Sequence, residues 1–379
     1  MSLVSLFFIS LTLHGYVGWR VLPDLPGAAA GLLAAVLVAS ALLMPMALLA
    51  RTLRQPLADR LAWAGALAMG LFSSLFVLTL LRDAVLLVAA IAGWALAGRF
   101  GAAAWAGPSA LAVPLLGAAV TAWGFVNARR TAAVVGIEVP IDGLPDALHG
   151  FTIAQISDIH VGPTIKRDYL QRIVEAVNRL EADMVAVTGD LVDGTVHELG
   201  AHVAPLAALT SRHGTFFVTG NHEYYSGAPA WVVELRRLGL QVLLNEHVVL
   251  EHGGAALVVA GVTDFGAHHF DAAQRSDPHR AIAGAPLAAA ARVLLAHQPR
   301  SAEAAARAGF DLQLSGHTHG GQFLPWNWFV PMQQPFTAGL NRLSQLWVYT
   351  SRGTGYWGPP KRFGAPSEIT RLRLVRAPG

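Results

Sequence analysis

Two residues that can bind a metal follow an apolar segment in the middle of the chain. The run from Phe151 to Ile156 has the composition of a buried strand, and Asp158 and His160 come directly after it. On an extended segment, side chains two residues apart point to the same side, so this carboxylate and this imidazole are expected to lie together. A carboxylate and an imidazole supply half of a metal site. Because a D-x-H sequence is common by chance, the rest of the chain must supply the other ligands.

Later segments repeat this arrangement, with Asp, Asn or His residues at the end of each predicted strand. The full set is Asp158, His160, Asp190, Asn221, His222, His297, His317 and His319. Oxygen and imidazole nitrogen ligands of this kind suit Mn, Fe, Zn or Mg. Two metals about 3.5–4 Å apart need a bridging carboxylate and clamp a phosphoryl group during displacement. Asp190 is the natural bridge.

Glycine precedes three of these groups, at Gly189, Gly220 and Gly316. Glycine permits a tight turn and a close approach of the backbone to a bound anion. The pattern therefore predicts an anion-binding site at the same strand ends as the metal ligands.

Together these blocks resemble the signature of the calcineurin-like metallophosphoesterases, from residue 151 to about 320. The matching blocks, in order, are Asp158-x-His160, Gly189-Asp190-x-x-Asp193, Gly220-Asn221-His222-Glu223, His297 and Gly316-His317-x-His319. Five blocks in the right order are specific, whereas any one alone is weak. The resemblance implies an α/β/β/α sandwich that hydrolyses phosphoesters with a metal-activated hydroxide.

The resemblance also implies a role for each residue. The first metal is bound by Asp158, His160 and His319, and Asp190 bridges. The second metal is bound by Asn221, His297 and His317. His222 protonates the leaving oxygen or stabilises the transition state, and Asp193 orients His222. We expect two divalent ions per chain, with Mn as the first candidate and Zn, Fe or Mg as alternatives.

Three further segments resemble a bacterial, membrane-anchored branch that includes UDP-2,3-diacylglucosamine hydrolases. They are Gln155-Ile156-Ser157-Asp158, Gly320-Gly321-Gln322 and Ser351-Arg352-Gly353. Arg352 and Arg362 are candidate phosphate contacts, since a guanidinium group matches phosphate geometry; a surface salt bridge is the alternative for each. Residues 323–363 are rich in Trp and Pro, and they are expected to cap the site, to rest on a bilayer or to form an ordinary packed loop.

Residues 131–379 alternate short β-rich runs with helical patterns, which predicts an α/β core with ligands at the strand ends. The predicted helices are 167–180, 196–209 and 231–238. The predicted strands are 134–141, 151–157, 184–188, 216–219, 241–244, 248–251, 256–260, 292–296, 311–314, 346–350 and 369–375.

Residues 1–130 are predicted to form a transmembrane helical domain. A span needs about 20 mainly apolar residues, and about five segments qualify, with Arg82-Asp83 as a tight turn between the third and fourth. The segments are 2–19, 27–50, 61–81, 84–98 and 108–125. The chain is therefore predicted to be a multi-pass protein of the cell (inner) membrane.

The positions of the arginines predict how the spans are oriented in the membrane. Arg51, Arg54 and Arg60 lie in one connection, which should be cytoplasmic. Five spans then place the following domain outside the cytoplasm, whereas Arg129 and Arg130 favour the inside. The extracytoplasmic side is the expectation.

Composition excludes several classes of function. The 379 residues contain no cysteine, which excludes disulfides, thiolate metal sites and a cysteine nucleophile. A formal charge of +3 without a basic run gives no reason to expect binding to nucleic acid.

The expected substrate is a phosphoester or pyrophosphate whose lipid part shares the bilayer. The alternatives are a tethered general phosphatase or phosphodiesterase, and a transporter or sensor whose domain only binds. The oligomeric state stays open.

Overall fold

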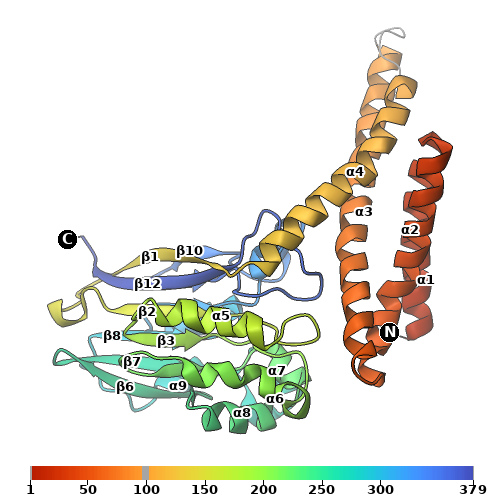
Figure 1. The fold of residues 1–379 in the computed structure, drawn as a ribbon. Coiled ribbons are helices and arrows are strands. Elements are labelled where there is room, and N and C mark those ends of the chain that lie inside the picture. The colour runs from red at the N-terminus through yellow and green to blue at the C-terminus, as the bar shows by residue number, and fades with distance from the viewer. Residues whose placement is uncertain (1, 96–101, 379) are drawn as a thin grey trace. The chain divides into compact units, whose positions relative to one another are not determined.

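The computed structural model describes residues 2–95 and 102–378 and divides into two compact units (Figure 1). The helical unit comprises Met1–Asn127 and Gly358–Phe363. The α/β unit comprises Ala128–Trp357 and Gly364–Gly379. The segment 358–363, late in the chain, thus packs with the N-terminal helices.

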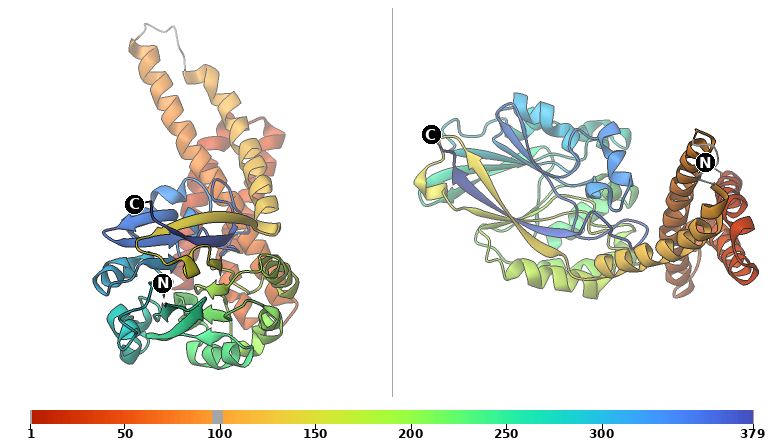
Figure 2. Two further views of the ribbon diagram at one scale, coloured as in Figure 1. Left: turned by 90° about the vertical axis from the view of Figure 1, so that its left-hand side faces the viewer. Right: turned by 90° about the horizontal axis from the view of Figure 1, so that it is seen from above.

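Four long helices build the helical unit, and α3 and α4 run side by side as an antiparallel pair (Figure 2). The elements are α1 (Leu3–Val21), η1 (Leu22–Asp24), α2 (Gly27–Met46), η2 (Ala47–Thr52), α3 (Leu57–Ala95) and α4 (Ala102–Arg129). Within the described residues, three stretches are long and apolar enough to cross a membrane. They are Gly27–Ala50, Leu57–Ala95 and Ala102–Arg129.

The predicted turn at Arg82-Asp83 is wrong, because α3 runs through it without a break. Arg82 is 4% exposed, pairs with Asp24 and donates to the carbonyl oxygen of Arg20 at 2.6 Å. Asp83 accepts hydrogen bonds from Tyr16 at 2.6 Å and from Arg20 at 2.9 Å. Since neighbouring helices satisfy both charged groups, the chain has no need to leave the helix there. The separate spans 61–81 and 84–98 therefore form one helix, and residues 96–98 lie outside the described part.

The α/β unit contains two six-stranded mixed sheets, in the orders β1-β12-β2-β3-β4-β5 and β10-β11-β9-β8-β7-β6. The first sheet's strands are β1 (Ala133–Ile141), β2 (Thr152–Ile156), β3 (Met184–Val187), β4 (Thr215–Phe217), β5 (Gln241–Val242) and β12 (Glu368–Arg376). The second sheet's strands are β6 (Glu246–His252), β7 (Ala255–Gly261), β8 (Ala291–Leu295), β9 (Leu312–Ser315), β10 (Gly339–Leu343) and β11 (Leu346–Thr350).

Three apolar layers hold this unit together. Residues such as Ile153, Phe216 and Leu314 are fully buried between the two sheets. Outside the first sheet lie α5 (Arg167–Asn178), α6 (Val196–Val203) and α8 (Ala228–Arg237), and outside the second lie α9 (Pro278–Ile282) and α10 (Ala302–Arg307) (Figure 1). The predicted α/β/β/α sandwich behind a helical membrane region is confirmed.

Parallel strands at the centre of each sheet bring their carboxyl ends to one edge. In the first sheet β2, β3 and β4 are parallel neighbours, with Ile156 beside Val187 and Val187 beside Phe217. In the second, β7, β8 and β9 are parallel, with Leu295 beside Leu314. The loops that leave these ends can therefore meet.

Candidate metal centre

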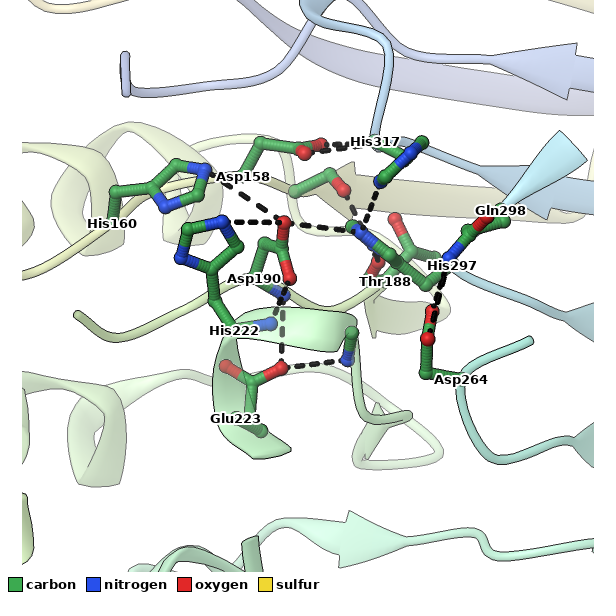
Figure 3. Close-up of polar contacts among 12 residues, drawn as sticks. Asp158, His160, Thr188, Asp190, His222, Glu223, Asp264, His297, Gln298 and His317 are labelled. Atoms are coloured by element: carbon green, nitrogen blue, oxygen red, sulfur yellow. Dashed lines mark hydrogen bonds and ion pairs between the residues drawn. The ribbon is translucent and has the colours of Figure 1, made fainter. Parts of the chain in front are cut away.

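Three groups of potential metal ligands lie at the carboxyl ends of the central strands. The first is Asp158, His160 and His319, the second is Asp190, His297 and His317, and the third, which shares His160 with the first, is His160, Asp193 and His222. Figure 3 shows Asp158, His160, Asp190, His222, His297 and His317 gathered in one place. Within each group the donor atoms lie within 4.8 Å of one another. The structure thus brings together six of the seven predicted ligands, in the grouping that the resemblance implies.

In the first group, two ring nitrogens face each other. Nε2 of His160 lies 3.0 Å from Nε2 of His319, which is 3.4 Å from Oδ1 of Asp158. The backbone N–H of His317 donates to the Asp158 carboxylate at 2.9 Å and so fixes its direction. Two imidazole nitrogens and a carboxylate oxygen that lie this close together form a donor set of the kind that binds a divalent ion.

The second group is oriented by a backbone carbonyl. Nδ1 of His297 donates to the carbonyl oxygen of Thr188 at 2.8 Å, since that oxygen can only accept. Nε2 of His297 then faces Oδ2 of Asp190 at 3.1 Å and Nδ1 of His317 at 3.2 Å. A histidine ligand held through its other nitrogen is the usual arrangement around a metal.

Asp190 belongs to the second group and also lies near His160 of the first. Its Oδ2 is 3.1 Å from Nε2 of His297 and 3.9 Å from Nε2 of His160. Its Oδ1 accepts the backbone N–H of His222 at 2.9 Å. This position supports the bridging role proposed for Asp190.

Asn221, the seventh predicted ligand, begins α7 (Asn221–Tyr225). Its side-chain oxygen Oδ1 is buried and has no hydrogen-bond partner within the described residues. A buried oxygen without a partner costs roughly 1–3 kcal/mol. A metal ion would remove that cost, so the residue fits its predicted place.

The buried carboxylates give the centre a strong negative field. Burial alone would lower the pKa of His160, but Asp193, Asp190 and Asp158 raise it to about 9. Burial, reinforced by the charge of His297, lowers the pKa of His317 to about 3. Three acidic groups in one buried region attract positive charge, and divalent ions are the largest local charges available to such sites.

Asp193 contacts two histidines and not only the one predicted. Its Oδ1 lies 2.6 Å from Nδ1 of His222 and 3.0 Å from Nδ1 of His160. Burial would raise the pKa of Asp193, yet His160 and His222 hold it well below its usual range. One ionised carboxylate thus fixes both rings, with each Nε2 facing the centre.

The backbone at the centre differs from the extended segment predicted for Asp158 and His160. Strand β2 ends at Ile156, and Asp158 and His160 have φ values of 54° and 56°. Three other predicted ligands also have positive φ, namely Asp190, His317 and His319. Non-glycine residues in this region store strain that persists at functional sites. Tight left-handed turns, and not strand alternation, therefore aim these side chains.

The predicted glycines are needed for close packing of the centre itself. A Cβ atom at Gly220 would lie 2.2 Å from Oδ1 of Asp190, and one at Gly316 would lie 2.2 Å from Oδ2 of Asp158. Gly189 has a φ of +86°, and a Cβ there would lie 2.6 Å from the backbone N of Gly220. The metal-binding loops approach each other so closely that no side chain fits at these positions.

Glu223 is a positioning residue to which the sequence assigned no role. Its buried carboxylate accepts backbone N–H groups from Gly220 at 2.6 Å, Leu191 at 2.7 Å and Asp190 at 3.0 Å. Burial, followed by the charge of Asp190, raises its pKa to about 7. The signal was available, since a Glu three residues after a helix N-cap is typical of a capping box.

The two arginines proposed as phosphate contacts lie in different environments. The guanidinium of Arg352 is 36% exposed and forms an ion pair with buried Glu368 at 2.8 Å. Arg362 belongs to the segment 358–363 of the helical unit, is fully buried, and donates its backbone N–H to the carbonyl oxygen of Gly124 at 2.9 Å. A role in substrate binding stays a prediction for both.

Comparison with known proteins agrees with this geometry. Residues 151–321 match the family described as calcineurin-like phosphoesterase. A protein of Aquifex aeolicus named an uncharacterized metallophosphoesterase is 32% identical over 224 residues, which cover 59% of this chain and 84% of that protein.

Two vertebrate relatives carry the name transmembrane protein with metallophosphoesterase domain. The one from Danio rerio is 38% identical over 271 residues, which cover 69% of this chain and 62% of the relative. The one from Bos taurus is 42% identical over 267 residues, which cover 67% of this chain and 60% of the relative. The chain therefore matches less than two thirds of the length of either vertebrate relative.

Proposed function

Because this chain belongs to the calcineurin-like phosphoesterase family, we propose that it hydrolyses a phosphoester or pyrophosphate with the help of two divalent metal ions. The observation that carries the proposal is the set of ligand groups that include or adjoin Asp190, together with the buried Oδ1 of Asn221, which has no hydrogen-bond partner among the described residues. When bound, such ions lower the pKa of water and neutralise charge on phosphorus oxygens. The donor set suits Mn first, with Zn, Fe or Mg as alternatives.

His222 is proposed as the group that gives a proton to the leaving oxygen. Its Nδ1 is held by Asp193 at 2.6 Å, while Nε2 lies 4.0 Å from Oδ2 of the proposed bridging residue Asp190. The His222 side chain is 16% exposed, so a substrate can reach part of its ring from solvent. A proton on Nε2 is thus positioned at the centre without His222 having to bind a metal.

The substrate is proposed to be lipid-linked or close to a membrane. Three apolar stretches of the helical unit qualify as spans, and two relatives are named as transmembrane proteins. In this proposal residues 1–130 form a multi-pass anchor in the cell membrane and residues 131–379 form the enzyme. A UDP-2,3-diacylglucosamine-like compound is one candidate substrate. A tethered general phosphatase is the second candidate.

Metal analysis of the gently purified full chain tests the proposal, together with hydrolysis of bis(4-nitrophenyl) phosphate with added Mn²⁺. We expect close to two metal ions per chain and metal-dependent hydrolysis. Asn221→Ala should lose about one ion, whereas His197→Ala, on the exposed face of α6, should retain both. A metal-free protein that still hydrolyses the ester would refute the metal mechanism. A two-metal protein inactive on phosphoesters would favour a domain that only binds.

A further inference from the structure

Exposed aromatic side chains surround the proposed proton donor. The imidazole of His222 contacts the ring of Tyr225 at a centroid distance of 5.4 Å and the ring of Trp357 at 5.6 Å, both edge to face. Phe270 continues this group, 5.6 Å from Tyr225. We call Tyr225, Phe270 and Trp357 the aromatic rim.

The rim leaves much of its apolar surface in solvent. Tyr225 is 62% exposed, and Phe270 and Trp357 are each 54% exposed. Contact with His222 therefore uses only part of these rings. Large exposed apolar groups next to a polar centre are typical of ligand sites, where a few polar groups orient the ligand and apolar surface binds the rest.

The backbone of Trp357 is tied to a metal-binding loop. The side chain of Gln322 accepts the backbone N–H of Trp357 and donates to its carbonyl oxygen, both at 2.8 Å. Gln322 is 8% exposed, has a φ of 60°, and follows the short 3-10 turn His319–Gly321 that begins with a predicted ligand. A half-exposed tryptophan is thus anchored to the same loop as His319.

We propose that Trp357 and Tyr225 bind an apolar part of the leaving group, and so determine the enzyme's substrate specificity. The inference rests on the proposed function, in which His222 protonates the leaving oxygen. A group that departs towards His222 comes within reach of both rings, since each of them contacts the imidazole. The chemistry that fits is an aryl or alkyl surface attached close to the phosphoester oxygen.

Nonhydrolysable phosphonates separate this contact from catalysis. Methyl-, phenyl- and hexylphosphonate share one head group, and their binding to the Mn²⁺-loaded full chain can be measured by titration calorimetry. We expect phenyl- or hexylphosphonate to bind about tenfold more tightly than methylphosphonate, which is the order of a favourable aromatic contact. The phosphonate whose affinity exceeds that of methylphosphonate by the larger factor shows whether the bound group is aryl or alkyl.

Two variants of Trp357 and one control complete the test. Trp357→Ala should abolish the preference for phenyl- or hexylphosphonate, while its affinity for methylphosphonate stays within twofold of that of the parent protein. Trp357→Phe should retain most of the preference. Trp328→Ala, which removes a tryptophan that is 73% exposed, should change none of the three affinities. Equal binding of all three phosphonates to the parent protein, or an equal loss for all three in Trp357→Ala, would overturn the inference. Failure of the proposed function looks different, because the parent protein would then neither bind methylphosphonate nor hydrolyse bis(4-nitrophenyl) phosphate.

Discussion

At the scale of single residues, Asp193 holds the rings of His160 and His222 in the same way, but the Nε2 atoms of the two rings have different neighbours. The facing nitrogens of His160 and His319 are 3.0 Å apart, whereas Nε2 of His222 is no closer than 4.0 Å to the Asp190 carboxylate oxygen Oδ2. We predict that His222→Ala keeps both metal ions and loses turnover by about 10²–10⁴-fold, the usual cost of a lost general acid. Metal analysis and kcat of the same preparation check this. Loss of metal would make His222 a ligand and contradict its proposed role.

Asp193 should behave differently, because it holds one proposed ligand as well as the proposed proton donor. Replacing Asp193 with Asn removes the carboxylate that fixes Nδ1 of both His160 and His222. We predict a loss of turnover together with metal affinity weakened about 10–100-fold, as expected for a group that orients a ligand. Competition with a chelator, measured for both variants, distinguishes them. Unchanged affinity in Asp193→Asn would show that it acts on His222 alone.

The sequence predicts the ligand types but not how their backbone aims them. Each of Asp158, Asp190 and His297 follows a buried strand, and the order of the blocks identifies them. The positive φ of Asp158 and the hydrogen bonds accepted by Glu223 depend on which loops meet at the carboxyl ends of the strands. Those contacts join residues far apart in the chain, so local patterns do not reveal them.

At the scale of elements, the loops that carry the predicted ligands pack so closely that a side chain does not fit at their glycines. A Cβ at Gly316 would lie 2.0 Å from Oγ of Ser157 and 2.2 Å from Oδ2 of Asp158. We predict that Gly316→Ala displaces the Asp158 carboxylate, lowers metal content and lowers the thermal midpoint. Gly136→Ala on β1 is the matched control, since nothing lies within 4 Å of its Cβ position and only a small effect is expected. Equal metal content in both variants would contradict the steric argument.

Elements were predictable where apolar runs are long and regular. Strands β2, β3, β8 and β9 agree with their predicted segments to within about two residues. The short elements α9, α10 and β10 were missed, because five or six residues carry too little periodicity. The turn predicted at Arg82-Asp83 was wrong, because the local sequence does not show that residues of other elements pair with these two charged side chains.

The segment 358–363 gives the helical unit a pH dependence. Lys361 is 2% exposed, and its ammonium donates to the carbonyl oxygen of Gly70 at 2.9 Å and to Oγ of Ser74 at 2.6 Å. Burial lowers its pKa to about 8, below the value near 10.4 of an unfolded lysine. Between these values the unfolded chain holds more protons, so stability rises with pH across this window and is lost as pH falls towards 8.

Replacing Lys361 with Met should remove that dependence. The free energy of unfolding of the parent protein, relative to Lys361→Met, should fall by about 2.5 kcal/mol from pH 10.4 to pH 8. Thermal midpoints in detergent across this range provide the measurement. The sequence contains one other lysine, Lys166, before α5, and Lys166→Met should keep the dependence of the parent protein. Parallel curves for the parent protein and Lys361→Met would show that Lys361 is not the source.

At the scale of the whole molecule, the continuous helix α3 changes the expected topology. Its 39 residues span about 58 Å, so as one continuous helix it would cross a bilayer core of about 30 Å once and not twice. If α3 and α4 both cross, two crossings separate the connection 47–56 from the α/β unit, whether or not α1 crosses. Arg51 and Arg54 in that connection, with Arg60 at the start of α3, favour the cytoplasm for it. In place of the extracytoplasmic side expected from five spans, we propose that the α/β unit faces the cytoplasm, the side that Arg129 and Arg130 also favour.

Single cysteines in this cysteine-free chain can test the sidedness. Thr52→Cys reports on the arginine-rich connection, Thr210→Cys on an exposed position of the α/β unit, and Pro26→Cys on the exposed connection between α1 and α2. With an impermeant thiol reagent on intact cells or spheroplasts, we predict labelling at position 26 only. Positions 52 and 210 should react together once the membrane is opened, since an even number of crossings separates them. Labelling of 210 in intact spheroplasts while 52 stays protected would restore the extracytoplasmic topology and require a further crossing between α3 and β1.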